Sequence, residues 1–196
     1  MALPFFNRVT PFFTQSRHLK AQNDLFFSAQ TALASRAYLA IGSNIKAEYN
    51  ISRCLTLLQT LPNCWDWVNS NWYWTRPWGI TEQADFINLV VGVTTCLSAP
   101  ALFAEMQQIE LELERVRAEK NGPRTIDLDL LLFGDAVLNT ETLTIPHPGL
   151  TQRDFMLRPL LEIAPEVQHP VLQIPLEMLA QDVIYHQIIQ LYNADH

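Results

Sequence analysis

Two carboxylates, Asp127 and Asp129, stand in a short apolar segment that follows the turn pair Gly122-Pro123. Residues two apart in a β-strand point to the same face, so both carboxylates are expected on one face of a mostly buried strand. Two like charges held close together with little hydration repel each other, and bound cations or nearby arginines would relieve that repulsion. The pair therefore indicates a divalent-metal site.

Alternation also predicts which apolar residues share each face of this strand. One face is expected to carry Ile126, Leu128, Leu130 and Leu132, while Leu131 and Phe133 continue the face of the carboxylates.

Arg115, Arg117 and Arg124 precede the strand closely. A lone D-x-D pattern is often only a solvated strand end, but the apolar continuation and these arginines argue against that interpretation. Mg²⁺ prefers a few carboxylates together with phosphate oxygens, and arginine matches the geometry of phosphate with paired donors. The combination indicates phosphoryl chemistry on a nucleotide.

Composition limits the class of protein. The chain has 196 residues, of which 48% are hydrophobic, enough for one domain with an ordinary core. Its formal charge of −7 argues against a general nucleic-acid surface. Cys54, Cys64 and Cys96 are odd in number and widely spaced, which predicts reduced thiols rather than a disulfide framework or a zinc site.

Residues 1–35 differ in composition from the rest of the chain. They contain Arg8, Arg17 and Lys20 against the single acid Asp24, and no apolar run has the length of a signal-peptide core or a membrane span. We expect these residues to form a disordered, dispensable extension. The protein itself is expected to be cytoplasmic and monomeric and to bind no membrane. The excess of basic and hydroxyl residues leaves organellar targeting as the alternative.

The order of elements follows from periodicity and from breaks in the chain. Short apolar and aromatic runs predict strands at residues 37–44, 65–74 and 85–95, ahead of the carboxylate strand. Helical spacing predicts one helix around residues 51–58 and another that begins with Ser98 as cap and Pro100 in its first turn. A further helical stretch is expected around residues 176–191.

This β-α-β-β-α-β order is that of a ferredoxin-like unit, an α+β fold with a mainly antiparallel sheet and two helices packed on one face. The domain is expected to cover residues 36–196. Such a fold hosts many functions, and the glycine-rich signatures of P-loop and Rossmann nucleotide sites are absent from the sequence.

The remaining candidate functional residues are polar residues on the second helix and a histidine beyond the carboxylate strand. Glu112 and Glu114 are interpreted as ordinary solvated residues. His147 stands between two prolines, which hold it in a rigid, extended turn. A lone histidine is more often structural, but rigid presentation favours a ligand contact.

Four stretches together closely resemble one enzyme family. They are AIGSN at 40–44, residues 75–88, RVR followed by GPRTIDLDLLLFG, and IPHPGLTQRDFMLRPLLEIAPE. The family is the 6-hydroxymethyl-7,8-dihydropterin pyrophosphokinases of folate biosynthesis, and the resemblance extends from about Ala37 to the C-terminus. It implies a ferredoxin-like αβα sandwich and the transfer of pyrophosphate from ATP to the hydroxymethyl group of the dihydropterin, with release of AMP.

The resemblance also implies roles for individual residues. Asp127 and Asp129 match the carboxylates that hold two Mg²⁺ ions, and Arg115 and Arg124 match arginines that neutralise charge on the transferred group. The positions that match ATP contacts are Gln107, Glu110, Arg117, His147 and Arg153. The positions that match the pterin pocket are Thr75, Trp78, Phe86, Asn88 and Phe155.

The sequence departs from the family pattern at the loop that precedes the carboxylate strand. Asn121 stands where some members carry a tryptophan that closes over the pterin, and the loop is slightly shorter. Arg76 replaces a frequent proline, and Pro148 stands where an aromatic residue can occur. These departures concern pterin affinity rather than metal or ATP binding.

Two other classes of protein compete with this interpretation. Another Mg²⁺-dependent nucleotide transferase that uses D-x-D would need its own nucleotide-sugar domain, or a Thr or Gly soon after Asp129, where Leu130 and Leu131 stand. A non-enzymatic ferredoxin-like module that senses a ligand would not need three arginines beside two buried carboxylates.

Overall fold

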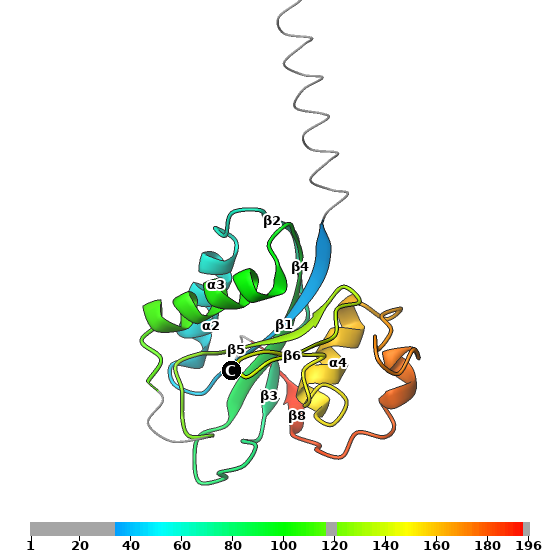
Figure 1. The fold of residues 1–196 in the computed structure, drawn as a ribbon. Helices are drawn as coiled ribbons and strands as arrows, with labels where there is room; N and C mark the ends of the chain where they lie inside the picture. Colours follow the sequence, from blue (N-terminus) through cyan, green and yellow to red (C-terminus); the bar gives the residue numbers. More distant parts are fainter. Residues whose placement is uncertain (1–33, 117–120, 194–196) are drawn as a thin grey trace, which may run out of the picture. The chain divides into compact units, whose positions relative to one another are not determined.

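The structure is a computed structural model that describes residues 34–116 and 121–193. Residues 35–196 make up one compact unit of the chain, in which Figure 1 shows a central sheet with helices on both faces. The predicted extension, residues 1–35, lies outside the described part except for its last two residues, and Ser35 already belongs to the first strand. No helix in the described ranges is both long and apolar enough to cross a membrane.

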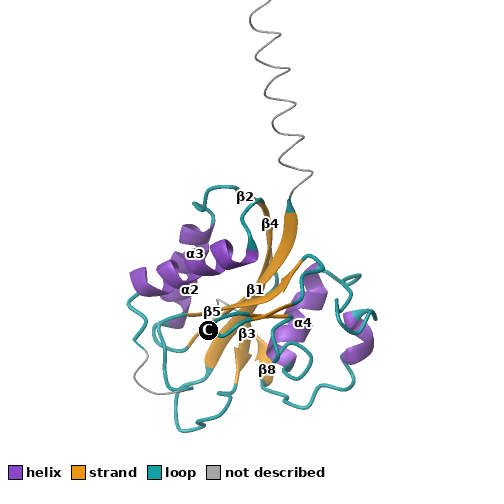
Figure 2. Cartoon of the chain, in the orientation of Figure 1, coloured by secondary structure: helices purple, strands orange, loops and turns teal. Residues whose placement is uncertain are grey.

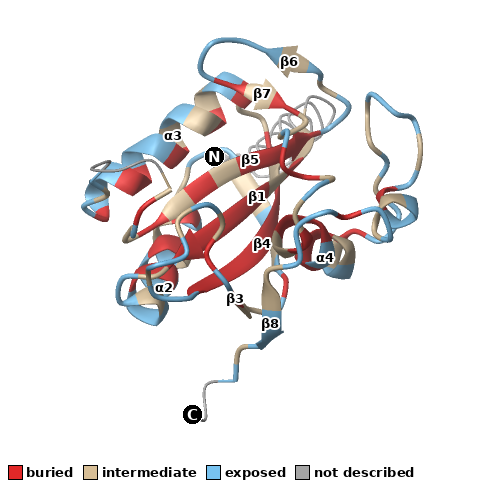
Figure 3. Ribbon diagram, turned by 90° about the horizontal axis from the view of Figure 1, so that it is seen from below, coloured by how far each residue is buried: buried red, intermediate tan, exposed pale blue. Residues whose placement is uncertain are grey.

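The sheet has six strands, and its described pairings are all antiparallel. Their order is β5 (Asp127–Phe133), β1 (Ser35–Ser43), β4 (Phe86–Thr95), β3 (Tyr73–Thr75) and β8 (Ile188–Leu191), and β2 (Cys64–Asn69) also pairs with β4. Two short strands, β6 (Leu138–Asn139) and β7 (Thr144–Ile145), pair separately. The central position of β1 and β4 and the dominance of apolar residues in both explain why they are almost wholly buried, as Figure 3 shows.

Helices cover both faces of the sheet, which confirms the αβα sandwich (Figure 2). Helices α2 (Ala47–Leu58) and α3 (Ala99–Glu112) pack on one face, around a core cluster that includes Leu39, Ile41 and Leu102. Helix α4 (Asp154–Ile163) covers the other face, around Leu131, Leu157 and Leu160.

The start of α3 confirms its predicted cap. The hydroxyl of Ser98 accepts a hydrogen bond from the Ala101 N–H at 3.3 Å, and Pro100 lies in the first turn. This arrangement satisfies an amide that the helix leaves free and uses proline where no amide is needed.

The predicted strand at 65–74 is divided in two. Ser70 ends β2, because its N–H donates to the Val90 carbonyl while its hydroxyl accepts from the Val90 N–H. The chain resumes pairing only at Tyr73, where β3 begins. The prediction of one continuous strand is therefore wrong. Both β2 and β3 nevertheless pair antiparallel with β4, as expected.

The predicted faces of β5 are correct only up to Leu131. Tyr38 pairs with Leu132 and Leu39 with Leu130, so Leu131 is an extra residue in a β-bulge. After it the alternation reverses: Leu132 packs in the cluster under α4, and Phe133 packs with α2 and α3. Both carboxylates precede the bulge and keep the shared face that the sequence predicts.

The C-terminal region contradicts the helix expected at 176–191. A short 3₁₀ helix (Leu176–Leu179) and the edge strand β8 occupy this range instead. Leu176 is fully buried in the cluster under α4, while Ile188 to Leu191 pair with β3. Tertiary pairing thus replaces the local helical pattern. Helix α4, which contains Pro159, was absent from the prediction.

Candidate active site

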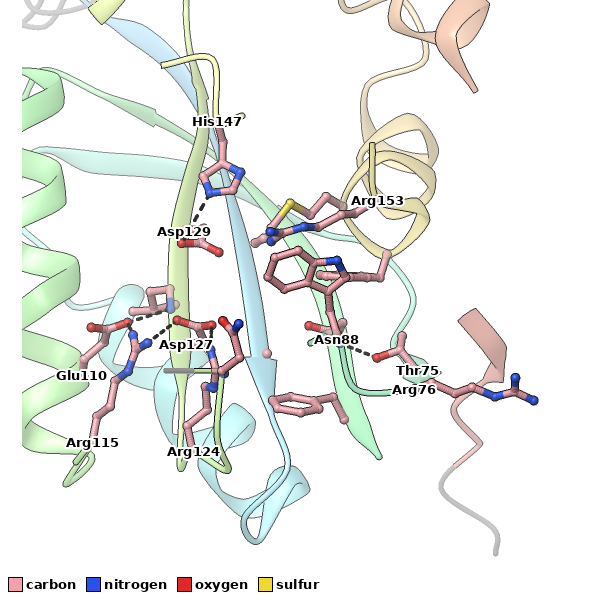
Figure 4. Close-up of a pocket in the computed structure, with 18 of the residues that line it drawn as sticks. Thr75, Arg76, Asn88, Glu110, Arg115, Arg124, Asp127, Asp129, His147 and Arg153 are labelled. Carbon is pink, nitrogen blue, oxygen red and sulfur yellow. Dashed lines mark hydrogen bonds and ion pairs between the residues drawn. The ribbon is translucent and has the colours of Figure 1, made fainter. Parts of the chain in front are cut away.

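A cavity of about 360 Å³ opens where β1, β4 and β5 meet the loops beside them (Figure 4). Of the residues assigned to the site from the sequence that the structure describes, all but Gln107 line it. Those that line it are Thr75, Trp78, Phe86, Asn88, Glu110, Arg115, Arg124, Asp127, Asp129, His147, Arg153 and Phe155.

Asp127 lies between two arginines at one side of the cavity. Its Oδ1 is 2.6 Å from Nη2 of Arg115, and its Oδ2 is 2.5 Å from Nη1 of Arg124. Arg115 also pairs with Glu110, whose carboxylate accepts a hydrogen bond from the Leu128 N–H at 2.8 Å. The buried Glu110 therefore ties α3 to β5 and orients Arg115 toward the carboxylate pair.

Asp129 is the more weakly compensated carboxylate. Loss of hydration, followed by the nearby charge of Asp127, raises its pKa to about 7 from an ordinary value of 3.8. About a third of its side chain remains accessible within the cavity. The repulsion expected from the sequence is thus present, and it acts mainly on Asp129.

His147 faces Asp129 from the turn after β7. Its Nδ1 accepts a hydrogen bond from the Gly149 N–H at 3.0 Å, and its Nε2 lies 3.9 Å from Oδ1 of Asp129. Burial and then the charge of Arg153 lower the pKa of His147 to about 4. At neutral pH the ring is uncharged, and because Nδ1 is an acceptor, Nε2 carries the proton toward Asp129.

The other wall of the cavity is a polar pair among aromatic side chains. Nδ2 of Asn88 donates to Oγ1 of Thr75 at 2.6 Å, and both residues are buried. A Cβ on Gly42 would lie 2.5 Å from Oδ1 of Asn88, so this glycine leaves the space that the amide occupies. The Arg124 guanidinium lies over the Phe86 ring at 5.5 Å, where the two walls meet.

Arg153 reaches from the start of α4 toward Asp129, as Figure 4 shows. Its guanidinium carbon lies 3.9 Å from the centre of the Trp78 ring and 6.0 Å from that of Phe155. Burial is the main cause that lowers its pKa, and the carboxylates Asp129 and Asp127 oppose that shift.

One predicted ATP contact, Gln107, is not among the residues that line the cavity, and a second, Arg117, cannot be placed. Gln107 is exposed on α3. Arg117 lies outside the described residues, together with residues 118–120 of the loop that precedes the carboxylate strand. Glu112 is half-exposed and 3.9 Å from Arg53, in agreement with its interpretation as a solvated residue.

Sequence reasoning missed a hydrogen-bond network that fixes the loops around the cavity. Asn44 donates to Oε1 of Gln83 at 2.9 Å and accepts from the Arg124 N–H at 2.8 Å, while Gln83 donates to the Asn121 carbonyl at 2.8 Å. Asn121, noted as a departure, therefore both lines the cavity and belongs to this network. The only sequence signal near it was the AIGSN stretch at 40–44, which ends at Asn44. Arg76 is exposed and is one of the residues that line the cavity, but its side chain extends away from the other labelled residues (Figure 4).

The donor set suits a metal that shares its ligands with phosphate. In the described ranges, no group of three or more His, Cys, Asp or Glu side chains could hold an ion alone. Mg²⁺ is usually held by one or two carboxylates together with waters and substrate phosphates, so the pair on β5 fits this cation without a third protein ligand. The pKa of Asp129 is raised because its negative charge is poorly hydrated and lies near that of Asp127, and a bound cation would stabilise that charge.

Fold and site together define a ferredoxin-like α+β protein that brings a carboxylate pair, arginines and an aromatic pocket into one cavity. The family model of 7,8-dihydro-6-hydroxymethylpterin-pyrophosphokinase matches residues 38–165. The chain belongs to this family.

Curated relatives agree with the family model. The chain is 38% identical over 156 residues to the 2-amino-4-hydroxy-6-hydroxymethyldihydropteridine pyrophosphokinase of Haemophilus influenzae, covering 79% of this chain and 97% of the relative. The enzyme of that name from Bacillus subtilis is 41% identical over 67% of this chain and 80% of its own length. Folic acid synthesis protein fol1 of Schizosaccharomyces pombe is 39% identical over 81% of this chain, which spans only 22% of that longer protein.

Solved structures show the same fold. The crystal structure of Plasmodium falciparum HPPK-DHPS with pterin and p-hydroxybenzoate matches 76% of this chain and 42% of its own, with a TM-score of 0.60 and 18% identity.

Proposed function

We propose that this chain transfers pyrophosphate from ATP to the hydroxymethyl group of 6-hydroxymethyl-7,8-dihydropterin, giving AMP and the pterin diphosphate for folate biosynthesis. The observation that supports this most is the meeting of two ligand environments in one cavity: carboxylates with arginines on one wall, and the Thr75–Asn88 pair among aromatic rings on the other. The names of the bacterial relatives agree with it.

On the ATP side, the arginines would neutralise the phosphates. Arg115 and Arg124 already meet at Asp127, so their charges are oriented before the nucleotide binds. We assign ATP contacts to Gln107, Glu110, Arg117, His147 and Arg153, as the family pattern implies. For Glu110 the contact would run through Arg115, since its carboxylate is already bonded to Arg115 and the Leu128 N–H.

On the pterin side, Phe86, Trp78 and Phe155 would stack on the ring, and Asn88 would hydrogen-bond its polar edge. Thr75 holds the amide of Asn88 in place, so the donors and acceptors of the pocket are fixed before the substrate arrives. A buried polar group of this kind discriminates strongly against a ligand that leaves it unpaired.

Asp127 and Asp129 would hold two Mg²⁺ ions, which when bound supply charge neutralisation on the phosphates and a template for them. The protein's own contribution is positioning. The substrate oxygen forms a bond to the β-phosphorus while the bond from that phosphorus to the oxygen of the leaving AMP breaks, and the hydroxyl proton passes to solvent. Such a transfer depends on alignment and charge stabilisation more than on a strong base.

We further propose a monomeric, cytoplasmic enzyme that acts on these small molecules and binds no nucleic acid or membrane.

The test is AMP release from ATP, Mg²⁺ and hydroxymethyl-dihydropterin, for wild type, Asp127→Ala, Asp129→Ala and the control Asp135→Ala. Asp135 follows β5 but is exposed in a turn, so its loss should leave activity within about twofold, as surface changes usually do. Each site variant should lose at least about 10³-fold, because charge neutralisation is the largest expected contribution. Substantial Mg²⁺-dependent AMP formation by either site variant would refute the roles of the pair. Absence of AMP in wild type would favour the ligand-sensing alternative.

A further inference from the structure

Arg153 occupies a narrow slot between a glycine and an indole ring. On one side its guanidinium carbon lies 3.9 Å from the centre of the Trp78 ring. On the other side, a Cβ added to Gly149 would lie 3.0 Å from both the guanidinium carbon and Nε. The buried Nε has no hydrogen-bond partner within the described part of the chain, so stacking holds this planar group in place.

Trp78 is itself supported by the C-terminal segment. The ring of Tyr185 meets the Trp78 ring edge-on, with centroids 6.0 Å apart and planes at 82°. Edge-to-face contacts of this kind are a favoured arrangement of aromatic pairs. Tyr185 therefore supports the indole of Trp78, although the two residues are far apart in the sequence.

Residues 184–188 are hydrogen-bonded both to the start of α4 and to the residue that follows β3. Toward α4, the Ile184 and Tyr185 N–H groups donate to the Gln152 carbonyl, and the Asp154 N–H donates to the Tyr185 carbonyl. Toward β3, the Arg76 N–H donates to the Gln187 carbonyl at 2.8 Å. One segment thus joins the loop that carries Trp78 to the turn that carries Arg153.

Asp154 anchors this segment. Its carboxylate is 3% exposed and accepts the Gln187 N–H at 2.9 Å and the Ile188 N–H at 3.1 Å. It stands in the first turn of α4, where a negative charge is favourable, and it directly follows Arg153 in the chain.

We infer that residues 184–188 act as a strap that positions Arg153: Asp154 fastens the strap and Tyr185 holds Trp78 against the guanidinium, which is kept facing Asp129. Tyr185 and Asp154 are positioning residues, since they act through Trp78 and Arg153. The inference rests on the proposed function only in naming ATP phosphate as the group that Arg153 meets.

The variants are Tyr185→Ala, which removes the supporting ring, Tyr185→Phe, which keeps it, and Asp154→Asn, which keeps the shape of the anchor. Tyr185 is 38% exposed, so its truncation should leave the fold intact. If Asp154→Asn does not fold, Tyr185→Leu replaces it as a second test of the ring.

The first readout needs no activity. In ¹⁵N NMR spectra, the Arg153 Nε–H signal is identified by its absence in Arg153→Lys. We expect a ring-current shift and slow exchange with solvent in wild type and Tyr185→Phe, and loss of both in Tyr185→Ala and Asp154→Asn. An unchanged signal in Tyr185→Ala would overturn the strap.

The second readout is steady-state kinetics. The KM for ATP should rise about three- to tenfold in Tyr185→Ala and Asp154→Asn, with kcat changed less, because a loosened cation–π contact weakens orientation of the ligand rather than removing it. Equal falls in kcat at constant KM, following the folded fraction, would show a merely structural role and contradict the inference. A wild type with the shifted Arg153 signal but no AMP release would reject the proposed function while supporting the strap.

Discussion

Asp129 is the residue at which the electrostatics of this site are least balanced. Asp127 has two arginines as direct ion-pair partners. Among the described residues, the side chain paired with Asp129 is the uncharged His147 at 3.9 Å, while Arg153 and Arg115 offset part of its charge without a direct ion pair. Its raised pKa means that the folded protein holds a proton on this carboxyl that the unfolded chain has already released at mildly acidic pH. The carboxylate that a cation would bind is therefore the one that destabilises the ligand-free protein.

This imbalance predicts a pH dependence for Asp129→Asn. Because the folded pKa is raised, the stability that the proton confers in wild type is present below about pH 4 and is lost as the pH rises through about 7. Without metal or ligand, the unfolding free energy of Asp129→Asn should therefore rise relative to that of wild type as the pH increases over this interval. We expect a difference of about 1 kcal/mol at pH 8, which is smaller than the full pKa shift would give because the carboxylate is partly accessible to solvent.

Urea unfolding of both proteins from pH 4 to pH 8 measures this difference. His147 is present in both, so the stability that its lowered pKa removes below about pH 6.5 largely cancels. A constant difference between the two proteins at every pH would contradict the electrostatic account of Asp129.

At the scale of elements, local pattern predicted β1, β4, β5, α2 and α3, because each carries a strong periodic or capping signal of its own. What the sequence could not predict depends on partners. The bulge at Leu131 arises from the register between β5 and β1, and β8 becomes a strand only because β3 offers an edge. The carboxylate pair, Arg115, Arg124 and His147 were indicated by their own sequence pattern, and the pterin-side residues by resemblance alone. Gly42 and the Asn44–Gln83 contacts could be found only from the packed loops.

Gly42 shows how the packing of β1 against β4 shapes the pocket. Gly42→Ala should push Asn88 away from Thr75, since the new Cβ would lie 2.5 Å from the amide oxygen. We expect pterin affinity to fall at least about tenfold through the loss of one buried hydrogen bond, with ATP affinity nearly unchanged.

Calorimetric titration of Gly42→Ala, Asn88→Ala and the double variant separates this mechanism from a general disturbance of the strand. If Gly42→Ala acts through Asn88, the double variant should bind pterin no more weakly than Asn88→Ala alone. Fully additive losses would show that the glycine matters for another reason.

At the scale of the whole molecule, the folded unit begins at Ser35 and the family match at residue 38. A chain of residues 34–196 should therefore keep its kcat/KM within about twofold of the full chain and its Tm within about 2 °C, because it retains the whole family match and the compact unit around it. Thermal unfolding and AMP release compare the two proteins. A loss of activity in the shorter chain at unchanged Tm would assign residues 1–33 a part in the site.

The cavity beside β5 brings both ligand environments together, which suits it to pyrophosphate transfer from ATP to the pterin. The most direct measurement is ³¹P NMR of a reaction that contains the full chain, ATP, Mg²⁺ and hydroxymethyl-dihydropterin. AMP and pterin diphosphate are expected in equal amounts, because the attack falls on the β-phosphorus. ADP with pterin monophosphate, or no pterin-dependent consumption of ATP, would contradict pyrophosphate transfer.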